Sequence, residues 1–165
     1  MATTSIPAAS MLVLRDAAPA DHPWILALAE VLFADLGDYR EILGDWLITP
    51  RAEAIVASDA GGMLGFAIVA PRPRIGFRRR VGAELVAIAV IERARRNGVG
   101  ARLVDEARRR ASDFGACEMR LHTAQGNTAG QEFFADCGFR PRRALPIFYP
   151  SGVRALEFCI ALPGS

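Results

Sequence analysis

Lysine is absent from this sequence of 165 residues, and all 20 basic residues are arginine. The absence excludes any mechanism in which a lysine amine forms a Schiff base or carries a proton. A large charge of one sign is also missing, because the formal net charge is only +2. Nucleic-acid-binding domains usually carry a strong basic excess. We therefore expect no nucleic acid among the partners.

Cysteine is rare, and long apolar runs are missing. Cys117, Cys137 and Cys159 lie far apart, which favours reduced, buried thiols over a disulfide framework or a metal site. No run reaches the roughly 18 apolar residues of a membrane span. Residues 1–10 lack the basic start and apolar core of a secretion signal. We expect a cytoplasmic protein, monomeric or homodimeric, with no bound metal and no membrane segment.

Hydrophobic residues are abundant, at 52% of the chain. A chain of this length and composition buries one core, so we expect a single domain over residues 11–165 behind a loose tail at 1–10. Charge is unevenly placed: residues 72–110 hold twelve arginines against four acids, and residues 16–45 hold seven acids against one arginine. This pattern favours a polyanionic ligand for one part and a cationic partner for the other, although solvated helix faces would produce it too.

The most informative stretch runs from residue 84 to residue 113. Residues 84–90 (ELVAIAV) read as a buried strand, residues 91–100 as a glycine-containing loop, and the rest as a helix. A strand that leads through such a loop into a helix N-terminus directs several backbone N–H groups at one point, where they bind phosphate. Gly98 and Gly100 let the backbone approach a ligand closely, and Arg95 and Arg96 supply guanidinium groups.

An ordinary strand-turn-helix with solvated arginines would show the same local pattern. The loop has neither the G-x-x-x-x-G-K-[ST] sequence of a P-loop nor the G-x-G-x-x-G sequence of a dinucleotide-binding turn. The loop alone therefore leaves both interpretations open.

The remaining elements alternate between strands and helices. We expect an α/β fold with a mixed sheet of about seven strands, partly parallel at its centre, and about four helices. The other expected strands cover residues 11–15, 53–58, 63–70, 116–123, 139–149 and 154–161, the other helices cover 20–35, 39–47 and 127–136, and a polar loop covers 71–80.

Two motifs together resemble a known family. Arg95-x-x-Gly98-x-Gly100, after a strand ending Ile-Ala-Val, is similar to the acetyl-CoA pyrophosphate loop of the GNAT superfamily of N-acetyltransferases. Residues 127–134 (NTAGQEFF) with 137–139 (CGF) resemble the later N-x-x-A-x-x-L-Y…G-F element of that family. Residues 148–155 and 161–163 are similar to the tail of ribosomal-protein alanine N-acetyltransferases and related N-terminal acetyltransferases.

The resemblance implies the GNAT fold and acetyl-CoA as co-substrate, without a metal. The strand ending at residue 90 would pair with the pantetheine arm, the loop amides would hold the pyrophosphate, and Asn127 would contact the arm from the other side. The implied cofactor-binding residues are Ile88, Ala89, Val90, Arg95, Arg96, Asn97, Gly98, Val99, Gly100, Ala101, Asn127 and Phe134.

The sequence departs from the family at two catalytic positions. The tyrosine that acts as general acid in the family falls at Phe134, which has no proton to donate. The glutamate base of the alanine N-acetyltransferases falls at His122. Cofactor binding is therefore better supported than catalysis.

Three residues are candidates for the missing acid and base: His122, Glu84 and Tyr149. A neutral imidazole at His122 could accept a proton from an ammonium group near neutral pH, or His122 could simply pair with Glu118. Glu84 occupies the place of the base in histone-type members of the superfamily. Alternatively, it could be a carboxylate at a strand edge that forms ion pairs with the arginines at 78–80. Tyr149 could serve as the acid, line the acceptor pocket, or be a plain aromatic residue at a strand end.

The sequence thus predicts an enzyme that transfers the acetyl group of acetyl-CoA directly to a primary amine, first of all a protein or peptide N-terminus. A small cationic amine, such as a polyamine or an aminoglycoside, is the second choice of acceptor. A catalytically degenerate CoA-binding module is a rival that Phe134 favours. An unrelated nucleotide-binding protein ranks last, because the resemblance of residues 127–139 to the family motif would then be a coincidence.

Overall fold

The chain was analysed as a computed structural model, which describes residues 11–72 and 81–163. The expected tail at 1–10 and nearly all of the expected loop at 71–80 lie outside the described residues. Four α-helices are present: α1 (His22–Leu32), α2 (Tyr39–Ile48), α3 (Val99–Asp113) and α4 (Thr128–Asp136). Seven strands are present: β1 (Val13–Asp16), β2 (Glu53–Asp59), β3 (Gly62–Pro71), β4 (Val81–Val90), β5 (Ala116–Ala124), β6 (Arg140–Leu145) and β7 (Ala155–Ala161).

The strands form one mixed sheet in the order β1-β2-β3-β4-β5-β7-β6. The β4–β5 pair is parallel and the other pairs are antiparallel. Helix α3 makes the crossover between β4 and β5, as a parallel pair requires. The expected α/β class, the seven strands with a parallel centre and the four helices are confirmed.

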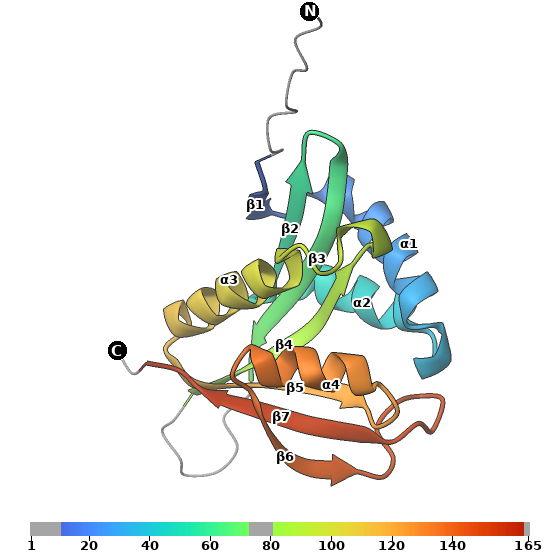
Figure 1. Cartoon of the computed structure of the whole chain (residues 1–165), viewed down its shortest axis with the longest axis vertical. Coiled ribbons are helices and arrows are strands. Elements are labelled where there is room, and N and C mark those ends of the chain that lie inside the picture. Colours follow the sequence, from blue (N-terminus) through green and yellow to red (C-terminus); the bar gives the residue numbers. More distant parts are fainter. Residues whose placement is uncertain (1–10, 73–80, 164–165) are drawn as a thin grey trace, which may run out of the picture.

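Helices cover both faces of the sheet (Figure 1). Buried side chains of α3 and α4, among them Leu103 and Phe134, pack on one face. Buried side chains of α1 and α2, among them Ile25 and Leu43, pack on the other face. Helix α3 buries an apolar stripe at helical spacing, made of Val99, Leu103, Ala107 and Ala111.

A β-bulge at Val86 changes the direction of the side chains along β4. In the pairing with β3, Ile68 faces Ala87 and Val69 faces Leu85, so Val86 is an extra residue. Before the bulge, Leu85 belongs to the core under α3, and after it Ala87 belongs to the core under α1 and α2. The exchange follows because one inserted residue reverses the two-residue alternation of a strand.

The expectation that residues 85–90 are fully buried was wrong in part. Val86, Ile88 and Val90 are only half-buried, and they alternate with buried neighbours. The three cysteines are free thiols and are half-buried rather than buried. The Arg110 side chain is only 11% exposed, because it forms ion pairs with Glu53 and Glu106. None of the described helices is both long enough and apolar enough to span a membrane.

Candidate functional site

The two central strands separate part of the way along their length. Strands β4 and β5 pair from Val81 and Ala116 to Leu85 and Leu121, where their register ends. Beyond that point β4 continues to Val90 and stays paired with β3 alone, while β5 continues to Ala124 beside β7. Figure 1 shows the two strands running apart. The edge of β4 that faces this fork can therefore pair with an extended ligand, as it would with a further strand.

Helix α3 begins just after the open end of β4. Gly98 is its N-cap, with φ of 79°, and no side chain in the described part of the chain caps it. Arg96, two residues earlier, also has a positive φ, 62°. The first-turn N–H groups of the helix are thus left without intrahelical acceptors, at the positive end of its dipole. This arrangement suits an anion such as a phosphate group.

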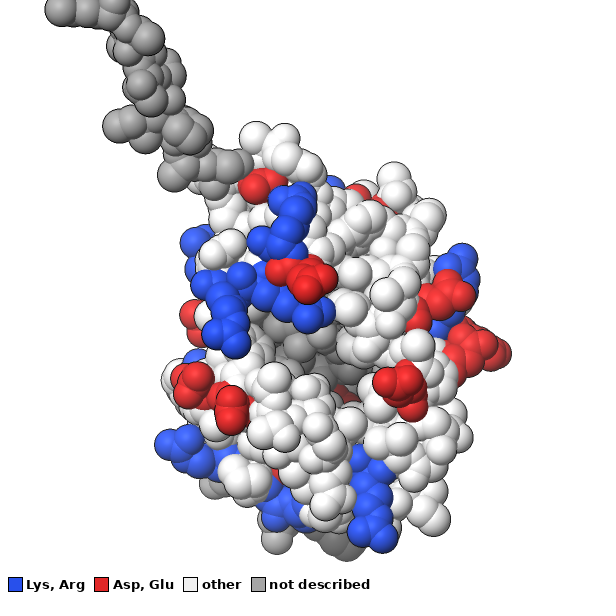
Figure 2. Space-filling model, turned by 45° about the vertical axis from the view of Figure 1, so that its right-hand side comes forward, with Lys and Arg blue, Asp and Glu red and all other residues white. Residues whose placement is uncertain are grey.

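The loop before α3 carries exposed arginines. Figure 2 shows basic side chains gathered on one side of a hollow in the molecular surface. Arg95 Nε donates a hydrogen bond to the Val90 carbonyl oxygen at 3.1 Å, which ties the loop back to the end of β4. The exposed arginines of this segment are Arg93, Arg95, Arg96 and Arg102.

Gly100 has a packing reason that the sequence did not reveal. A Cβ atom at Gly100 would lie 3.0 and 3.2 Å from two ring carbons of Phe133 in α4. A side chain here would push the two helices apart, because real Cβ atoms rarely approach so closely. A Cβ atom at Gly98 would meet nothing within 4 Å, so packing does not require glycine there. Glycine is favoured at this position because the backbone has a left-handed φ of 79°.

At the closed end of the fork, four polar side chains form a line across four adjacent strands, which we call the polar row. Its members are Glu84 on β4, His122 on β5, Glu157 on β7 and Arg143 on β6. His122 Nδ1 lies 3.2 Å from Glu84 Oε1, and His122 Nε2 lies 3.3 Å from Glu157 Oε2. Arg143 donates two hydrogen bonds to the Glu157 carboxylate, at 3.2 and 3.4 Å.

The sheet register places these side chains together. His122 and Glu157 are direct partners across β5 and β7, and Arg143 and Glu157 are direct partners across β6 and β7. Direct partners in an antiparallel pair point to the same face. Glu84 lies one residue before the last paired position of β4, and His122 lies one residue after the last paired position of β5.

Glu157 is a buried charge surrounded by arginines. Its side chain is 1% exposed, and the guanidinium groups of Arg142 and Arg120 lie 3.7 and 3.9 Å from its oxygens, beyond the Arg143 hydrogen bonds. Burial acts to raise the pKa of the Glu157 carboxyl, but the Arg143 hydrogen bonds and the surrounding positive charges outweigh it and lower that pKa. The carboxylate is therefore ionised at neutral pH.

An aromatic series connects the polar row to the first residue of α2. The Phe148 ring stacks on the His122 ring at 4.2 Å, and the Tyr149 ring lies 4.9 Å from that of Phe148. Tyr39 follows at 6.1 Å from Tyr149. Burial, with a smaller effect of Glu84, raises the pKa of Tyr39 to about 12, and burial beside Tyr39 raises the pKa of Tyr149. Both phenols keep their protons at neutral pH.

The structure brings the three candidate catalytic residues into one region. His122 contacts Glu84 directly, and Tyr149 is separated from His122 by the Phe148 ring. The alternative partner for His122 was wrong: Glu118 pairs with Arg120 and Arg142 instead. The alternative partners of Glu84, the arginines at 78–80, lie outside the described residues. Tyr149 begins a turn rather than ending a strand.

The remaining predicted residues are split between the fork and the core. Ile88, Ala89 and Val90 lie along the open part of β4, and residues 95–101 form the loop and first turn of α3. Asn127 is the N-cap of α4. Phe134 is 7% exposed and packs in the core beneath α3 and α4.

Sequence reasoning missed Glu157, Arg143 and Tyr39. Glu157 gave a usable signal, because it is the single charged residue in the strand ALEFCIA. A lone carboxylate in an otherwise apolar strand predicts a buried partner. Arg143 is one of three arginines in β6 and Tyr39 resembles a core residue, so neither stood out.

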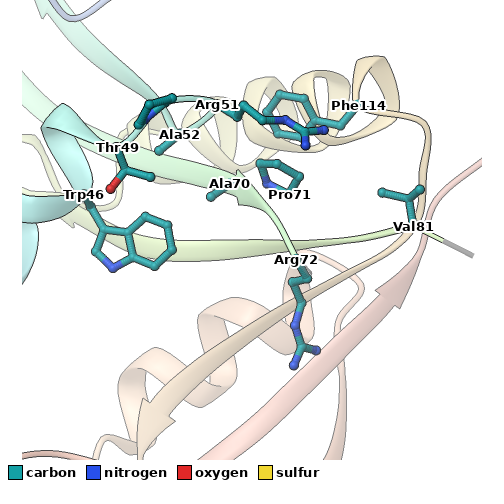
Figure 3. A pocket seen from close by; sticks show the side chains of 10 residues that line it. Trp46, Thr49, Arg51, Ala52, Ala70, Pro71, Arg72, Val81 and Phe114 are labelled. Atoms are coloured by element: carbon teal, nitrogen blue, oxygen red, sulfur yellow. The ribbon is translucent and has the colours of Figure 1, made fainter. Parts of the chain in front are cut away.

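A separate hollow of about 480 Å³ lies at the other end of β4 (Figure 3). Trp46, Arg51, Pro71 and Phe114 line it, with Arg72 pointing away from the others. Arg72 reaches toward the polar row, with its Nε 4.0 Å from Glu84 Oε2. Its lining residues Arg72 and Val81 flank residues 73–80 in sequence. Because residues 73–80 are not described, we assign no function to the hollow.

Solved structures with this fold include several acetyltransferases. Arabidopsis thaliana NAA60 in complex with acetyl-CoA has a TM-score of 0.79 at 16% identity, over 93% of this chain and 100% of that chain. Ribosomal-protein-alanine N-acetyltransferase from Brucella melitensis has a TM-score of 0.72 at 23% identity, over 91% and 99%. Nourseothricin acetyltransferase has a TM-score of 0.71 at 21% identity, over 92% and 99%.

A curated relative and a family model match the sequence itself. The relative is GCN5-related N-acetyltransferase 7, chloroplastic, from Arabidopsis thaliana, 31% identical over 86 residues. The match covers 50% of this chain and 31% of the relative, so it spans about a third of that protein's length. The model of the acetyltransferase (GNAT) family matches residues 18–139, which include the fork, the α3 loop and the Asn127 motif. The chain therefore belongs to the acetyltransferase (GNAT) family.

Proposed function

We propose that this protein is an acetyl-CoA-dependent N-acetyltransferase that acts on the free α-amine of a protein or peptide. One observation carries the proposal: Glu84 Oε1 and His122 Nδ1 lie 3.2 Å apart at the closed end of the fork, whose open end leads to the uncapped α3 N-terminus. The proposed amine-activating group and the proposed anion site thus lie at opposite ends of the β4 edge that is not paired with β5.

The separation of these two ends suits the cofactor. Val90 lies five residues beyond Leu85 along β4, which corresponds to roughly 17 Å of extended chain. Acetyl-CoA carries its pyrophosphate and its thioester at opposite ends of an extended pantetheine arm. With the pyrophosphate at residues 96–101, the arm would lie along residues 88–90 and direct the thioester toward the polar row.

The reaction then needs one proton acceptor and one proton donor. Glu84, 28% exposed and with its Oε1 3.2 Å from His122 Nδ1, takes a proton from the acceptor ammonium group. The freed amine forms a C–N bond with the thioester carbonyl carbon, and the C–S bond breaks as the thiolate takes a proton from the donor. The nitrogen then loses its second proton, which restores the donor and leaves the neutral amide. Tyr149 is the phenol proposed as that donor, because it holds its proton at neutral pH and lies beside Phe148.

The surface near the site favours a cationic acceptor. The segment between α1 and α2 contacts the β6–β7 turn, where Ser151 N–H donates to the Leu36 carbonyl oxygen at 3.2 Å. Asp35 and Asp38, on either side of Leu36 in sequence, are exposed. Further exposed acids on the same two helices are Glu30, Glu41 and Asp45. Two of the similar structures are named with a protein or peptide substrate. They are ribosomal-protein-alanine N-acetyltransferase and the NatC complex bound to Gag peptide.

Thiol release from acetyl-CoA tests the proposal with three acceptor classes: short peptides with free N-termini, polyamines, and aminoglycosides. We expect turnover with peptides, and none with the same peptides when their N-termini are blocked. Turnover only with polyamines or aminoglycosides would move the acceptor to small amines, in line with the likeness to nourseothricin acetyltransferase. Calorimetric binding of acetyl-CoA without turnover in any class would favour a CoA-binding module.

A further inference from the structure

We propose that Glu157 is a positioning residue that fixes the protonation pattern of His122, so that the Nδ1 lone pair of the imidazole faces Glu84. This inference rests on the proposed function, because it assigns a role within the acid–base site of that reaction. It concerns a side chain on β7, the strand next to β5 on the side away from the fork.

The hydrogen-bonding capacity of histidine limits which neighbours the His122 ring can serve. A neutral imidazole has one N–H group and one lone pair, so it can donate to only one of its two carboxylate neighbours. Both Glu84 and Glu157 lie within hydrogen-bond distance of the ring, at 3.2 and 3.3 Å. The stronger acceptor therefore decides which nitrogen carries the proton.

Glu157 is the stronger acceptor because of its surroundings. Its side chain is 1% exposed, against 28% for Glu84, so water weakens its interaction with the ring far less. Arg143 donates to both of its oxygens, which holds the carboxylate in place. The neutral His122 ring consequently carries its proton on Nε2, directed at Glu157.

The consequence falls on Glu84. With the proton on Nε2, the Nδ1 lone pair points at Glu84 Oε1, and two electron-rich atoms lie close together. That repulsion is relieved when Glu84 receives a proton and donates it in a hydrogen bond to Nδ1. The pair is thereby prepared to accept one proton from the acceptor ammonium group.

The solvent exposure of Glu84 and His122 determines from which side the acceptor ammonium group can approach the pair. His122 is 9% exposed, and the Phe148 ring covers one of its faces. Glu84 is the more accessible end of the pair, so the ammonium group meets Glu84, and His122 and Glu157 act behind it. Within residues 11–72 and 81–163, Arg72 and Tyr39 are the other titratable groups near Glu84, and Arg120 and Arg142 are the others near Glu157.

The test compares Glu157→Gln with a matched control, Glu118→Gln. Both replace a carboxylate beside Arg120 and Arg142, but Glu118 pairs with those arginines and not with His122. We expect Glu157→Gln to lower kcat/KM roughly 10- to 100-fold, as the loss of a supporting hydrogen-bond partner does at metal-bound histidines. We expect Glu118→Gln to stay within about twofold of the wild type, and acetyl-CoA affinity to be unchanged in both.

The imidazole tautomer supplies a readout that a merely structural role would not move. The chain has only two histidines, so the His122 ring can be assigned by nitrogen NMR with His22→Gln as reference. We expect the Nε2–H form in the wild type and a shift toward the Nδ1–H form in Glu157→Gln, where Glu84 is the only carboxylate left beside the ring. An unchanged tautomer, or equal kinetic effects of the two variants, would overturn the inference.

Two further measurements cover the cases in which Glu157→Gln does not fold or the wild type is inactive. If Glu157→Gln does not fold, Arg143→Gln replaces it, because Arg143 is 57% exposed on an edge strand and holds the same carboxylate. A smaller shift of the tautomer in the same direction is then expected, and no shift would contradict the proposal. If the wild type acetylates no amine, the proposed function fails, yet the tautomer measurement still decides the role of Glu157.

Discussion

At the scale of single residues, the structure gives charged side chains partners from distant parts of the sequence. Asp21 illustrates this outside the site: Arg15 donates to both of its oxygens, at 2.6 and 3.0 Å, and the Ala18 N–H donates to one of them at 2.8 Å. The Arg15 hydrogen bonds, against the opposing effect of burial, lower the pKa of Asp21 to about 2.

The stability of the protein should therefore depend on Asp21 above pH 4. A carboxyl whose pKa is lowered by folding stabilises the native state above its unfolded pKa, near 3.9, and loses that contribution as the pH falls through its folded pKa. We expect Asp21→Asn to reduce the free energy of unfolding by about 2 kcal/mol at pH 7. The difference from the wild type should shrink toward zero near pH 2, in urea denaturation at both pH values.

A pair on the surface provides the control for this prediction. Arg40 and Glu30 are 53% and 62% exposed and lie 3.2 Å apart. Exposed pairs contribute little, so Glu30→Gln should change the stability by less than about 1 kcal/mol. A loss at Asp21→Asn that stays constant from pH 7 to pH 2 would mean that the ionised carboxylate is not what stabilises the fold.

At the scale of elements, glycine at position 37 lets two loops meet. Gly37 has φ of 126°, and a Cβ there would lie 2.8 Å from the Pro150 Cβ. We expect Gly37→Ala to displace the β6–β7 turn that carries Tyr149, and so to raise KM for the acceptor amine several-fold. Acetyl-CoA affinity should not change, because the α3 loop lies elsewhere. Steady-state kinetics and calorimetry measure the two quantities.

Gly62 provides a control that separates backbone strain from a steric clash with a neighbouring loop. It has a similar φ of 113°, but a Cβ there would meet nothing within 4 Å. Gly62→Ala should cost on the order of 1 kcal/mol of stability through its backbone alone, without any effect on KM. If both variants raised KM equally, contact between the two loops would not be the cause.

Asn127 shows how one residue can serve a helix and a predicted ligand site. Its Oδ1 accepts from the Gly130 N–H at 3.0 Å, and its Nδ2 donates to Thr123 Oγ1 at 3.2 Å. We expect Asn127→Ala to cost about 1 kcal/mol of stability through loss of the cap, and Asn127→Asp, which keeps an acceptor, to cost much less. Thermal denaturation compares them.

The same two variants test the predicted cofactor contact of Asn127. A loss of acetyl-CoA affinity in both variants, including the stable Asp variant, would support a contact through the amide group. Wild-type affinity in Asn127→Asp would leave Asn127 with the capping role alone.

At the scale of the whole molecule, one sheet joins two cores. Leu103 is fully buried in the core under α3, whereas Trp24 and Trp46 pack against the core under α1 and α2. Because the same strands bound both cores, we expect a single unfolding transition. Leu103→Ala should lower the stability by roughly 2 to 5 kcal/mol, and tryptophan fluorescence and circular dichroism should shift together. A fluorescence midpoint that stays in place while the dichroism midpoint moves would mean that the two cores unfold separately.

The sequence by itself determined the elements and the family. Apolar patterns and turn residues predicted all four helices and all seven strands, because side-chain spacing and turn chemistry are local properties of the sequence. The motifs at 95–100 and 127–139 identified the family for the same reason, since each is a short continuous segment. Element ends were less accurate: the strand expected over 139–149 stops at Leu145 in the structure.

Only the tertiary structure decided how the candidate site is assembled. The Val86 bulge and the end of β4–β5 pairing open the fork, and the strand order β4-β5-β7-β6 brings Glu84, His122, Glu157 and Arg143 into one line. The sequence could not rank Glu157 above Glu118 as the partner of His122. The preference depends on cross-strand register and burial, which are set by contacts between residues more than thirty positions apart.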